Sequence, residues 1–435
     1  MGEVINKFFS HCKRVAKADI VKVFSFTVVS TLVKMLTGLI SVKVVASVIG
    51  PAGIALLGQL NNFTVIVMTL ANGGINNGIV KYIAEYKEDR GKVIVFLSTA
   101  LRITLFCSLI IGLFMILFHT YLSKVIMLSS EYGYVFTVFG LTVLMYSLNM
   151  MLISVINGFK EFRMYVKISI ANSVVGVLFT LVFVYTLGLK GALISAVTYQ
   201  SVMLCVTFLM VRKLPWVDWE YFKKKLNILV GKKYFRYSLM TLVTTTIVPI
   251  SQMFLRGYVI SEISVVEAGW WEGMNRISNM YLMVITSSFS VYYLPRLSEL
   301  TDEIELRREI FKAYSVIMPM LLIGFSLVYF LRHFIISMLF TPDFYPMENL
   351  FLWQLLGDFF KICSWLLAFL MIAKSMMKTF IFTEIIFAGT FVGMSLLLIQ
   401  SNGIIGITQA YVGNYILYLI TMFFIFRKML SIKKR

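Results

Sequence analysis

Apolar stretches long enough to cross a lipid bilayer make up most of this 435-residue chain. Hydrophobic residues form 59% of the sequence and charged residues only 14%, and the mean hydropathy of +0.86 excludes an ordinary soluble domain. Because a spanning helix needs about 20 mostly apolar residues, we predict an all-α polytopic membrane protein with about 12 transmembrane helices in two six-helix bundles around a central cavity. The predicted spans are 23–48, 53–77, 93–118, 132–156, 164–187, 190–211, 237–258, 272–294, 314–338, 350–373, 377–399 and 404–426.

The basic charge of the chain follows the order of these spans. The formal net charge is +19. If the N-terminus is cytoplasmic, thirty-one lysines and arginines fall in cytoplasmic segments and four in the loops on the other side. Short cytoplasmic loops of membrane proteins are enriched in these residues. We therefore predict that both termini are cytoplasmic and that the basic excess sets the topology, with no nucleic acid as partner.

Motifs for a metal, a nucleotide or a catalytic centre are absent from the sequence. The four cysteines have no CxxC spacing and the three histidines lie apart at segment ends, so neither disulfides nor a metal site is predicted. No GxGxxG, P-loop or GxSxG pattern occurs. An ATP-driven pump is therefore not expected from this chain alone, and no catalytic residue is predicted.

The chain divides around its longest polar segment. We predict an N-terminal six-helix bundle at 1–211, a cytoplasmic amphipathic linker at 212–236 and a C-terminal six-helix bundle at 237–435. A solvated loop that only sets the topology is an equal alternative for the linker. An offset of 213 residues aligns Ser25 with Ser238, Thr31 with Thr244, Lys43 with Arg256, Asn62 with Asn275, and Asp89 with Asp302. This weak repeat predicts two halves of one topology with the transport pathway between them.

Polar residues recur on one face of spans 1, 2, 7 and 8, which predicts a wet central cavity built from both halves. The polar side chains predicted to line the cavity are Thr31, Asn62, Asn72, Asn76, Gln252, Asn275 and Asn279. Each has a simpler interpretation, because Ser, Thr and Asn in spanning helices often only hydrogen-bond to a neighbouring helix.

Charges inside spans are costly and are therefore candidates for function. We predict that Lys34, Lys43, Arg256 and Arg276 bind the substrate in the cavity. Lys43 lies about 180° from Lys34 around an ideal helix, so both face one cavity only if the helix bends. Without a bend, Lys43 extends to the outer interface, and the same alternative applies to Arg256 near a span end.

Three further charges lie in spans 10 and 11. Asp358 and Lys361 are three residues apart on one helix face, which predicts either a structural ion pair or a coupling site. Glu384 is either a helix-pairing residue or a protonatable coupling residue. No cofactor is predicted, apart from coupling to protons or sodium ions.

The predicted cavity suits an anion that carries hydroxyl groups. Buried cations require an anionic partner, and the arginine fork and the lysine ammonium both suit phosphate oxygens. Amide and hydroxyl side chains suit sugars. These features predict a phosphate-bearing glycan whose lipid tail remains in the bilayer, whereas a hydrophobic drug cation would be repelled.

Several stretches spread over both halves carry a family resemblance: STLVKMLTGLISVKVV (30–45), GPAGIALLGQ (50–59), GGINNGIVKYIAEY (73–86), SSFSVYYLPRLSEL (287–300), WQLLGDFFK (353–361) and MIAK (371–374). With them the chain resembles the Wzx-type oligosaccharide-lipid flippases of the multidrug/oligosaccharidyl-lipid/polysaccharide exporter superfamily. It looks closest to the branch that handles the enterobacterial common antigen lipid intermediate, and O-antigen members look alike.

This resemblance implies a bacterial inner-membrane protein that moves an undecaprenyl-pyrophosphate-linked oligosaccharide from the cytoplasmic to the periplasmic leaflet. A polysaccharide polymerase and a chain-length regulator are the pathway partners it suggests. Lys34, Lys43, Asp358 and Lys361 fall within these stretches, and Glu384 follows the last of them in a part of the chain that the resemblance also covers. The role of Arg276 rests on helix geometry alone.

Two other functions stay open from the sequence. A cation-coupled drug exporter of the same superfamily would need an acidic cavity. A membrane polysaccharide polymerase or lipid-linked glycosyltransferase would need carboxylates on the periplasmic side, where the sequence offers only Glu262, Glu267 and Glu272.

Overall fold

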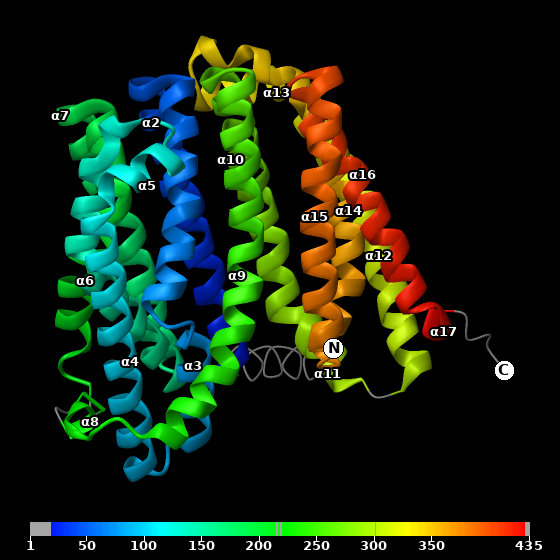
Figure 1. The fold of residues 1–435 in the computed structure, drawn as a ribbon. Coiled ribbons are helices and arrows are strands. Elements are labelled where there is room, and N and C mark those ends of the chain that lie inside the picture. The colour runs from blue at the N-terminus through cyan, green and yellow to red at the C-terminus, as the bar shows by residue number, and fades with distance from the viewer. Residues whose placement is uncertain (1–18, 215, 218–219, 301, 431–435) are drawn as a thin grey trace, which may run out of the picture.

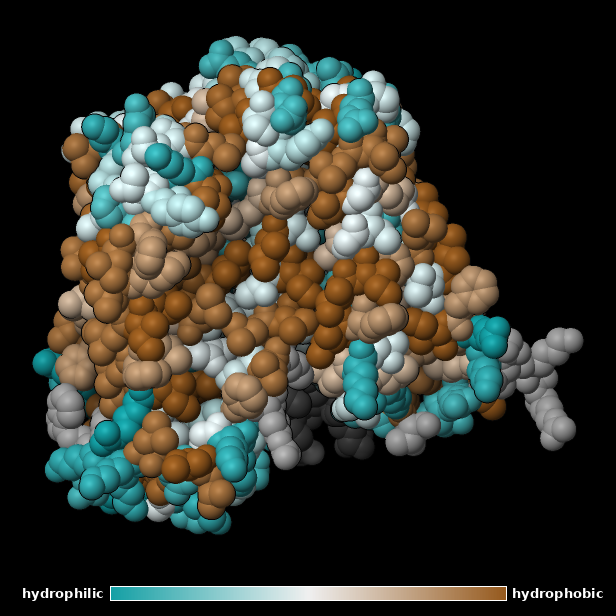
Figure 2. Space-filling model, viewed as in Figure 1, coloured by the Kyte–Doolittle hydropathy of each residue, from teal (hydrophilic) through white to brown (hydrophobic). Residues whose placement is uncertain are grey.

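The protein is a bundle of long helices that stand side by side (Figure 1). The computed structural model describes residues 19–214, 216–217, 220–300 and 302–430, and these residues contain no strand. Eight of the described helices are long and apolar enough to cross a membrane. On the face shown in Figure 2, apolar side chains form a broad band across the middle of the molecule, and polar side chains gather toward its two ends. This distribution is that of a protein embedded in a bilayer.

Two of these eight helices are each folded by a glycine into a pair of spans. α2 (Asp19–Ala71) has 53 residues, which at 1.5 Å per residue would reach about 80 Å and far exceed the bilayer. It turns at Gly50, whose φ of 63° lies in the left-handed region that glycine adopts without steric cost. α7 (Phe162–Val211) turns at Gly188, with a φ of 57°. The eight helices therefore supply ten spans.

Two further helices, which are less apolar than these eight, complete the twelve predicted spans. They are α9 (Ile228–Glu262) and α10 (Val265–Ser288), which stand near the middle of the bundle (Figure 1). Both carry ionisable residues at depth, including Arg256 in α9 and Glu272 and Arg276 in α10. The predicted all-α fold with about 12 spans is therefore confirmed, and its least apolar helices are those at the centre.

The remaining spans are α4 (Arg90–Leu117), α6 (Gly133–Gly158), α12 (Glu303–Phe330), α14 (Glu348–Ala373), α15 (Met377–Asn402) and α16 (Ile405–Ile425). Short elements join them: α3 (Asn76–Tyr86), α5 (His119–Ile126), η1 (Ser130–Tyr132), α8 (Glu220–Lys223), the π-helical η2 (Phe289–Tyr293), α11 (Leu294–Glu299), α13 (Arg332–Leu339), η3 (Pro342–Met347) and α17 (Arg427–Leu430). In Figure 1, α5 and α13 lie at the upper end of the molecule, and α3, α8, α11 and α17 lie at the lower end. Segment 212–236 contains α8 and the beginning of α9.

The internal repeat predicted from the sequence is confirmed by the helix bounds. Adding 213 to the residue numbers of α4 and α5 gives the bounds of α12 and α13. Asp89 and Asp302, one of the aligned pairs, cap the N-termini of α4 and α12 by accepting a hydrogen bond from a backbone N–H three residues on. With an offset of 215, Gly188 corresponds to Gly403, and both have left-handed backbone conformations. The two halves therefore share one topology.

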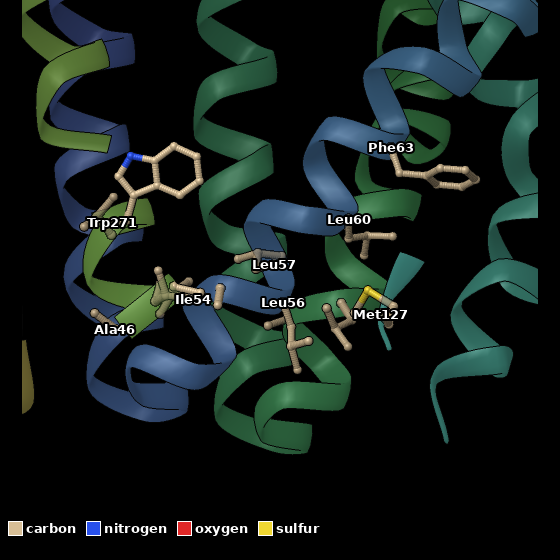
Figure 3. Packing of buried hydrophobic residues seen from close by; sticks show 14 of the residues in the cluster. Ala46, Ile54, Leu56, Leu57, Leu60, Phe63, Met127 and Trp271 are labelled. Carbon is tan, nitrogen blue, oxygen red and sulfur yellow. The ribbon is translucent and has the colours of Figure 1, made fainter. Parts of the chain in front are cut away.

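The two halves are joined by apolar packing at the upper end and diverge at the lower end. One continuous cluster at the upper end contains Val45 and Ile54 of α2, Trp271 of α10, and Phe340 at the end of α13. Figure 3 shows Trp271 beside the turn of α2 that carries Ala46 and Ile54. At the lower end, one cluster lies within the second half, and a separate cluster combines the first half with the start of α9. The molecule is therefore closed at its upper end.

The boundary between the halves runs through α9. The buried Tyr234 near its lower end donates a hydrogen bond from its hydroxyl to the carbonyl oxygen of Phe96 in α4, at 3.3 Å. Ser238 donates to the carbonyl oxygen of Gly73, also in the first half. The same helix packs along α15 of the second half. α9 therefore forms contacts with both halves of the molecule.

Replacing Gly269 by alanine is expected to weaken the closed upper end. A Cβ at Gly269 would lie 2.0 Å from the carbonyl oxygen of Pro51, so α10 could no longer approach α2 as closely. Such overpacking typically costs about 1–3 kcal/mol. The thermal unfolding midpoint in detergent should fall for Gly269→Ala. It should hold or rise for Gly324→Ala, where a Cβ meets no atom within 4 Å and alanine favours the helix. Equal unfolding midpoints for Gly269→Ala and Gly324→Ala would contradict the close approach of α10 to α2.

Candidate functional site

The first cavity of interest lies between α2, α7 and α10 and has a volume of about 300 Å³. It is lined by Lys34, Thr37, Gly38, Ser41, Val45, Leu57, Asn61, Asn172, Ser173, Gly176, Val177, Thr180, Ala192, Ser195, Ala196, Tyr199 and Arg276. Lys34 and Arg276 are its charged residues, and no carboxylate lines it among the residues that the structure describes. The cavity is therefore cationic and otherwise rich in hydroxyl and amide groups.

The two cations of the first cavity have unused hydrogen-bonding capacity. The ammonium of Lys34 forms no hydrogen bond or ion pair with any described residue. Arg276 donates from Nε to Glu272 Oε1 at 3.1 Å, while its Nη2 is buried without a partner. Buried polar groups in native proteins are nearly always hydrogen-bonded, so an unmet guanidinium donor indicates a ligand or water at this point. An anion with several oxygens would satisfy both cations.

Arg256 lies outside this cavity, in an ion-pair network close to the upper end. It is 1% exposed, and its Nη2 lies 2.6 Å from Glu272 Oε2. Its Nη1 donates to Gln59 Oε1 in the first half at 3.3 Å. Its guanidinium also lies 5.4 Å from the ring centre of Trp271. Arg256, predicted as a substrate-binding cation, therefore lines none of the three cavities described here and instead bridges the two halves.

Lys43 likewise bridges the halves and does not share the cavity of Lys34. Its Nζ donates to the carbonyl oxygens of Ser337 at 3.1 Å and Phe340 at 2.9 Å, at the C-terminal end of α13. The last carbonyls of a helix carry partial negative charge and attract cations. Lys43 and Arg256 are the pair that the 213-residue offset aligns. Each therefore reaches from its own half to the other at the closed end.

Of the predicted polar lining, Asn62 and Gln252 form a contact between helices. Asn62 donates from Nδ2 to Gln252 Oε1 at 3.2 Å, which joins α2 to α9. Asn275 has a buried Nδ2 without a partner, and Asn279 is exposed. Thr31 is half-buried and lines none of the three cavities.

Asn72 and Asn76 do not continue the polar face of the second span as predicted. The helix ends at Ala71, and Asn76 begins α3. Gly73 and Gly74 between them have φ values of 62° and 65°, which break the helix at this point. The prediction of one straight helical face was therefore wrong here, because the two glycines turn the chain.

The second cavity, of about 210 Å³, lies within the second half. It is lined by Val248, Ser251, Gln252, Lys361, Trp365, Glu384, Phe387, Ala388, Phe391, Tyr411, Asn414, Tyr415 and Tyr418. Lys361 lies 5.0–5.4 Å from the ring centres of Trp365, Tyr411 and Tyr415. Two of the three predicted coupling residues, Lys361 and Glu384, therefore share a pocket with aromatic walls.

Asp358 lies behind this pocket in a closed hydrogen-bond network. Its carboxylate is 0% exposed and accepts hydrogen bonds from Ser278 Oγ at 2.6 Å, from the Tyr281 hydroxyl, and from the Tyr411 hydroxyl at 2.8 Å. Lys361 Nζ donates to the same Tyr411 hydroxyl at 2.9 Å. In the described residues, no direct ion pair joins Asp358 to Lys361, and the tyrosine separates them. These contacts give Asp358 a role in joining α10, α14 and α16.

A third and larger cavity, of about 600 Å³, lies between α10, η2 and α12. Its walls are almost entirely apolar, including Val284, Phe289 and Met320. Glu309 and Lys312, which follow the N-terminal turns of α12, are the charged residues among its lining. Met35 of α2 also lines it, next in sequence to Lys34 of the first cavity. The apolar and cationic cavities therefore border the same turn of α2.

Sequence reasoning missed several of the residues that complete these sites. Asn172 and Thr180 of α7 line the first cavity, and their four-residue spacing through Gly176 is a helical face that could have been recognised. Glu272 was considered only as a candidate for an enzyme, although it pairs with both Arg256 and Arg276. Its partners lie 16 and 4 residues away, and only the second distance is a helical spacing that sequence can indicate.

Comparison with known proteins shows the family to which this chain belongs. The sequence profile of the polysaccharide biosynthesis protein family matches residues 20–301. The chain belongs to this family. Among relatives of this polysaccharide biosynthesis protein, the Lipid III flippase of Escherichia coli (strain K12) is 29% identical over 400 residues, which cover 92% of this chain and 96% of the relative.

Solved structures share the fold of this polysaccharide biosynthesis protein. An inward-facing multidrug resistance MATE family transporter of the MOP superfamily gives a TM-score of 0.76 at 13% identity, covering 92% of this chain and 98% of the other. An outward-facing conformation of such a transporter gives 0.60 at 14% identity, covering 92% and 95%. The arrangement of helices therefore lies closer to the inward-facing form.

Proposed function

We propose that this chain is a flippase that moves a lipid-linked oligosaccharide from the cytoplasmic to the periplasmic leaflet of a bacterial inner membrane. The observation that carries this proposal is the first cavity, where Lys34 and Arg276 face a space lined by hydroxyl and amide groups. Such a site suits the pyrophosphate of an undecaprenyl-pyrophosphate-linked glycan, because both cations form strong charge-assisted hydrogen bonds with phosphate oxygens. The similarity to the Lipid III flippase supports the same cargo.

The lipid tail has a separate place in this proposal. The apolar third cavity and the first cavity border the same turn of α2, at Met35 and Lys34. A polyprenyl chain bound there keeps its apolar surface out of water while the head group occupies the cationic cavity. A drug cation, the cargo of the alternative exporter function, would meet Lys34 and Arg276 without a neutralising carboxylate among the described lining residues.

The proposed transport cycle is alternating access. The upper end is the periplasmic end if both termini are cytoplasmic, as the basic loops predict. In the present conformation this end is closed by the upper apolar cluster and by Lys43 and Arg256, each of which bonds to the opposite half. The head group enters between the diverging lower ends, and release requires the upper contacts to part.

Complementation tests this function. The chain is expressed in a strain that lacks its own oligosaccharide-lipid flippase, and mature surface glycan and lipid-linked precursor are scored together. Restored glycan with cleared precursor is the expected result. A second assay uses proteoliposomes with undecaprenyl-pyrophosphate-linked sugar and measures its exposure in each leaflet. Normal membrane abundance with no transbilayer movement in the liposomes would overturn the proposal.

A further inference from the structure

The second cavity occupies the same position in the second half as the cationic cavity does in the first. With an offset of 215 residues, five lining positions of the first cavity coincide with lining positions of the second. These pairs are Asn172 and Phe387, Ser173 and Ala388, Gly176 and Phe391, Ala196 and Tyr411, and Tyr199 and Asn414. The two cavities are therefore duplicates of one structural element, and their chemistry has diverged.

At two of these positions the divergence replaces a small residue by an aromatic ring. Gly176 of the first cavity corresponds to Phe391, and Ala196 corresponds to Tyr411. Six rings in all line the second cavity, from Trp365, Phe387, Phe391, Tyr411, Tyr415 and Tyr418. The first cavity carries two cations, whereas the second carries one cation and one carboxylate. The second cavity is therefore formally neutral and unsuited to a pyrophosphate.

Polar groups in this aromatic pocket still have free hydrogen-bonding capacity. The Glu384 carboxylate lines it and forms no hydrogen bond or ion pair with any residue in the described part of the chain. Lys361 uses one of its three N–H groups to donate a hydrogen bond to the Tyr411 hydroxyl. Asn414 accepts from Thr390 at 2.6 Å through Oδ1, which leaves its Nδ2 amide available. The pocket therefore offers donors and an acceptor beside flat apolar surfaces.

A sugar ring matches this combination. Its faces are apolar C–H surfaces that lie on aromatic rings, and its rim carries hydroxyls that donate to a carboxylate and accept from an ammonium and an amide. A quaternary ammonium ligand is excluded, because Lys361 already occupies the ring faces. A lipid tail would leave the charged groups unsolvated. The volume of about 210 Å³ is smaller than the roughly 300 Å³ of typical drug-sized sites, which suits one ring.

One contact between the halves connects the linings of the two cavities. Asn61 of α2 lines the first cavity, and the adjacent Asn62 donates at 3.2 Å to Gln252, which lines the second. We propose that the aromatic pocket of the second half is a carbohydrate subsite that binds a neutral pyranose ring of the lipid-linked glycan. This inference rests on the proposed function. It assigns the phosphate to the first half and a sugar to the second, so the complete substrate links the two halves.

Binding of two lipids to the purified full chain in nanodiscs tests the subsite. The probes are undecaprenyl pyrophosphate and the same lipid carrying one N-acetylhexosamine. The wild type should bind the sugar-bearing lipid about tenfold more tightly, the contribution of a stacked ring with new hydrogen bonds. Trp365→Leu should remove this difference and leave the affinity for the sugar-free lipid unchanged. Trp365→Phe should preserve much of it.

The matched control is Tyr185→Leu, which removes a ring that is 69% exposed on α7 and should preserve the difference. Equal wild-type affinities for the two lipids would overturn the subsite while leaving the flippase proposal intact. So would an equal loss for both lipids in Trp365→Leu, because that result indicates a purely structural role. If the wild type binds neither lipid, the proposed function itself fails. Tyr415→Leu provides a second test if Trp365→Leu does not fold.

Discussion

Replacing Glu272 by glutamine is expected to destabilise the closed upper end strongly. Glu272 is the carboxylate that neutralises Arg256, which is 1% exposed, and it also accepts a hydrogen bond from Arg276. Glutamine removes the negative charge and leaves a guanidinium buried without a counter-ion. Breaking a buried pair in this way costs about 3–5 kcal/mol. The thermal unfolding midpoint of the purified protein in detergent should therefore fall sharply.

Two comparisons separate the buried pair from a general effect of charge. Glu262→Gln removes an exposed carboxylate at the end of α9 and should leave the midpoint nearly unchanged. The double variant with Arg256→Met and Glu272→Met replaces the most deeply buried pair by apolar side chains and should recover part of the lost stability, although Arg276 still loses its carboxylate. A Glu272→Gln protein as stable as the wild type would show that Arg256 keeps its charge compensated by another route.

The residues that sequence analysis placed well are those governed by local rules. The spans follow from the length of the apolar stretches, and α9 and α10 were found despite their ionisable residues. The repeat was visible in Asp89 and Asp302, because an N-capping aspartate is a local requirement of the helix that follows. Lys34 was placed on the polar face of its helix, and the structure locates it in a cavity.

The residues that sequence analysis misplaced depend on contacts between distant helices. Lys43 and Arg256 are cations in spans like Lys34, but their partners on α13 and α2 are roughly 200 to 300 positions away in sequence. The ion pair expected between Asp358 and Lys361 from their spacing is replaced by Tyr411, which enters from α16. No periodicity within one helix indicates which neighbour it faces. The exception is Glu272, since its four-residue spacing to Arg276 was readable.

Removing the ammonium of Lys34 is expected to abolish most transport without lowering the amount of protein in the membrane. The ammonium of Lys34 forms no hydrogen bond or ion pair with any described residue, so Lys34→Ala breaks no polar side-chain contact within the described fold. A charge-assisted hydrogen bond to a phosphate is worth about 1.5–3 kcal/mol, which corresponds to roughly tenfold to a hundredfold in affinity. Binding of undecaprenyl pyrophosphate and complementation by surface glycan should both fall, and Lys34→Arg should restore part of each.

Lys43 on the same helix provides the matched comparison, because it carries the same charge and has a different structural role. Its ammonium is bonded to the carbonyl oxygens of Ser337 and Phe340 and does not line the cavity of Lys34. Lys43→Ala should therefore leave the affinity for undecaprenyl pyrophosphate unchanged and loosen the closed upper end. Normal glycan output from Lys34→Ala, or an equal loss of affinity in both variants, would contradict a phosphate contact at Lys34. A loss of affinity confined to Lys34→Ala would separate substrate binding from closure on one helix, nine residues apart.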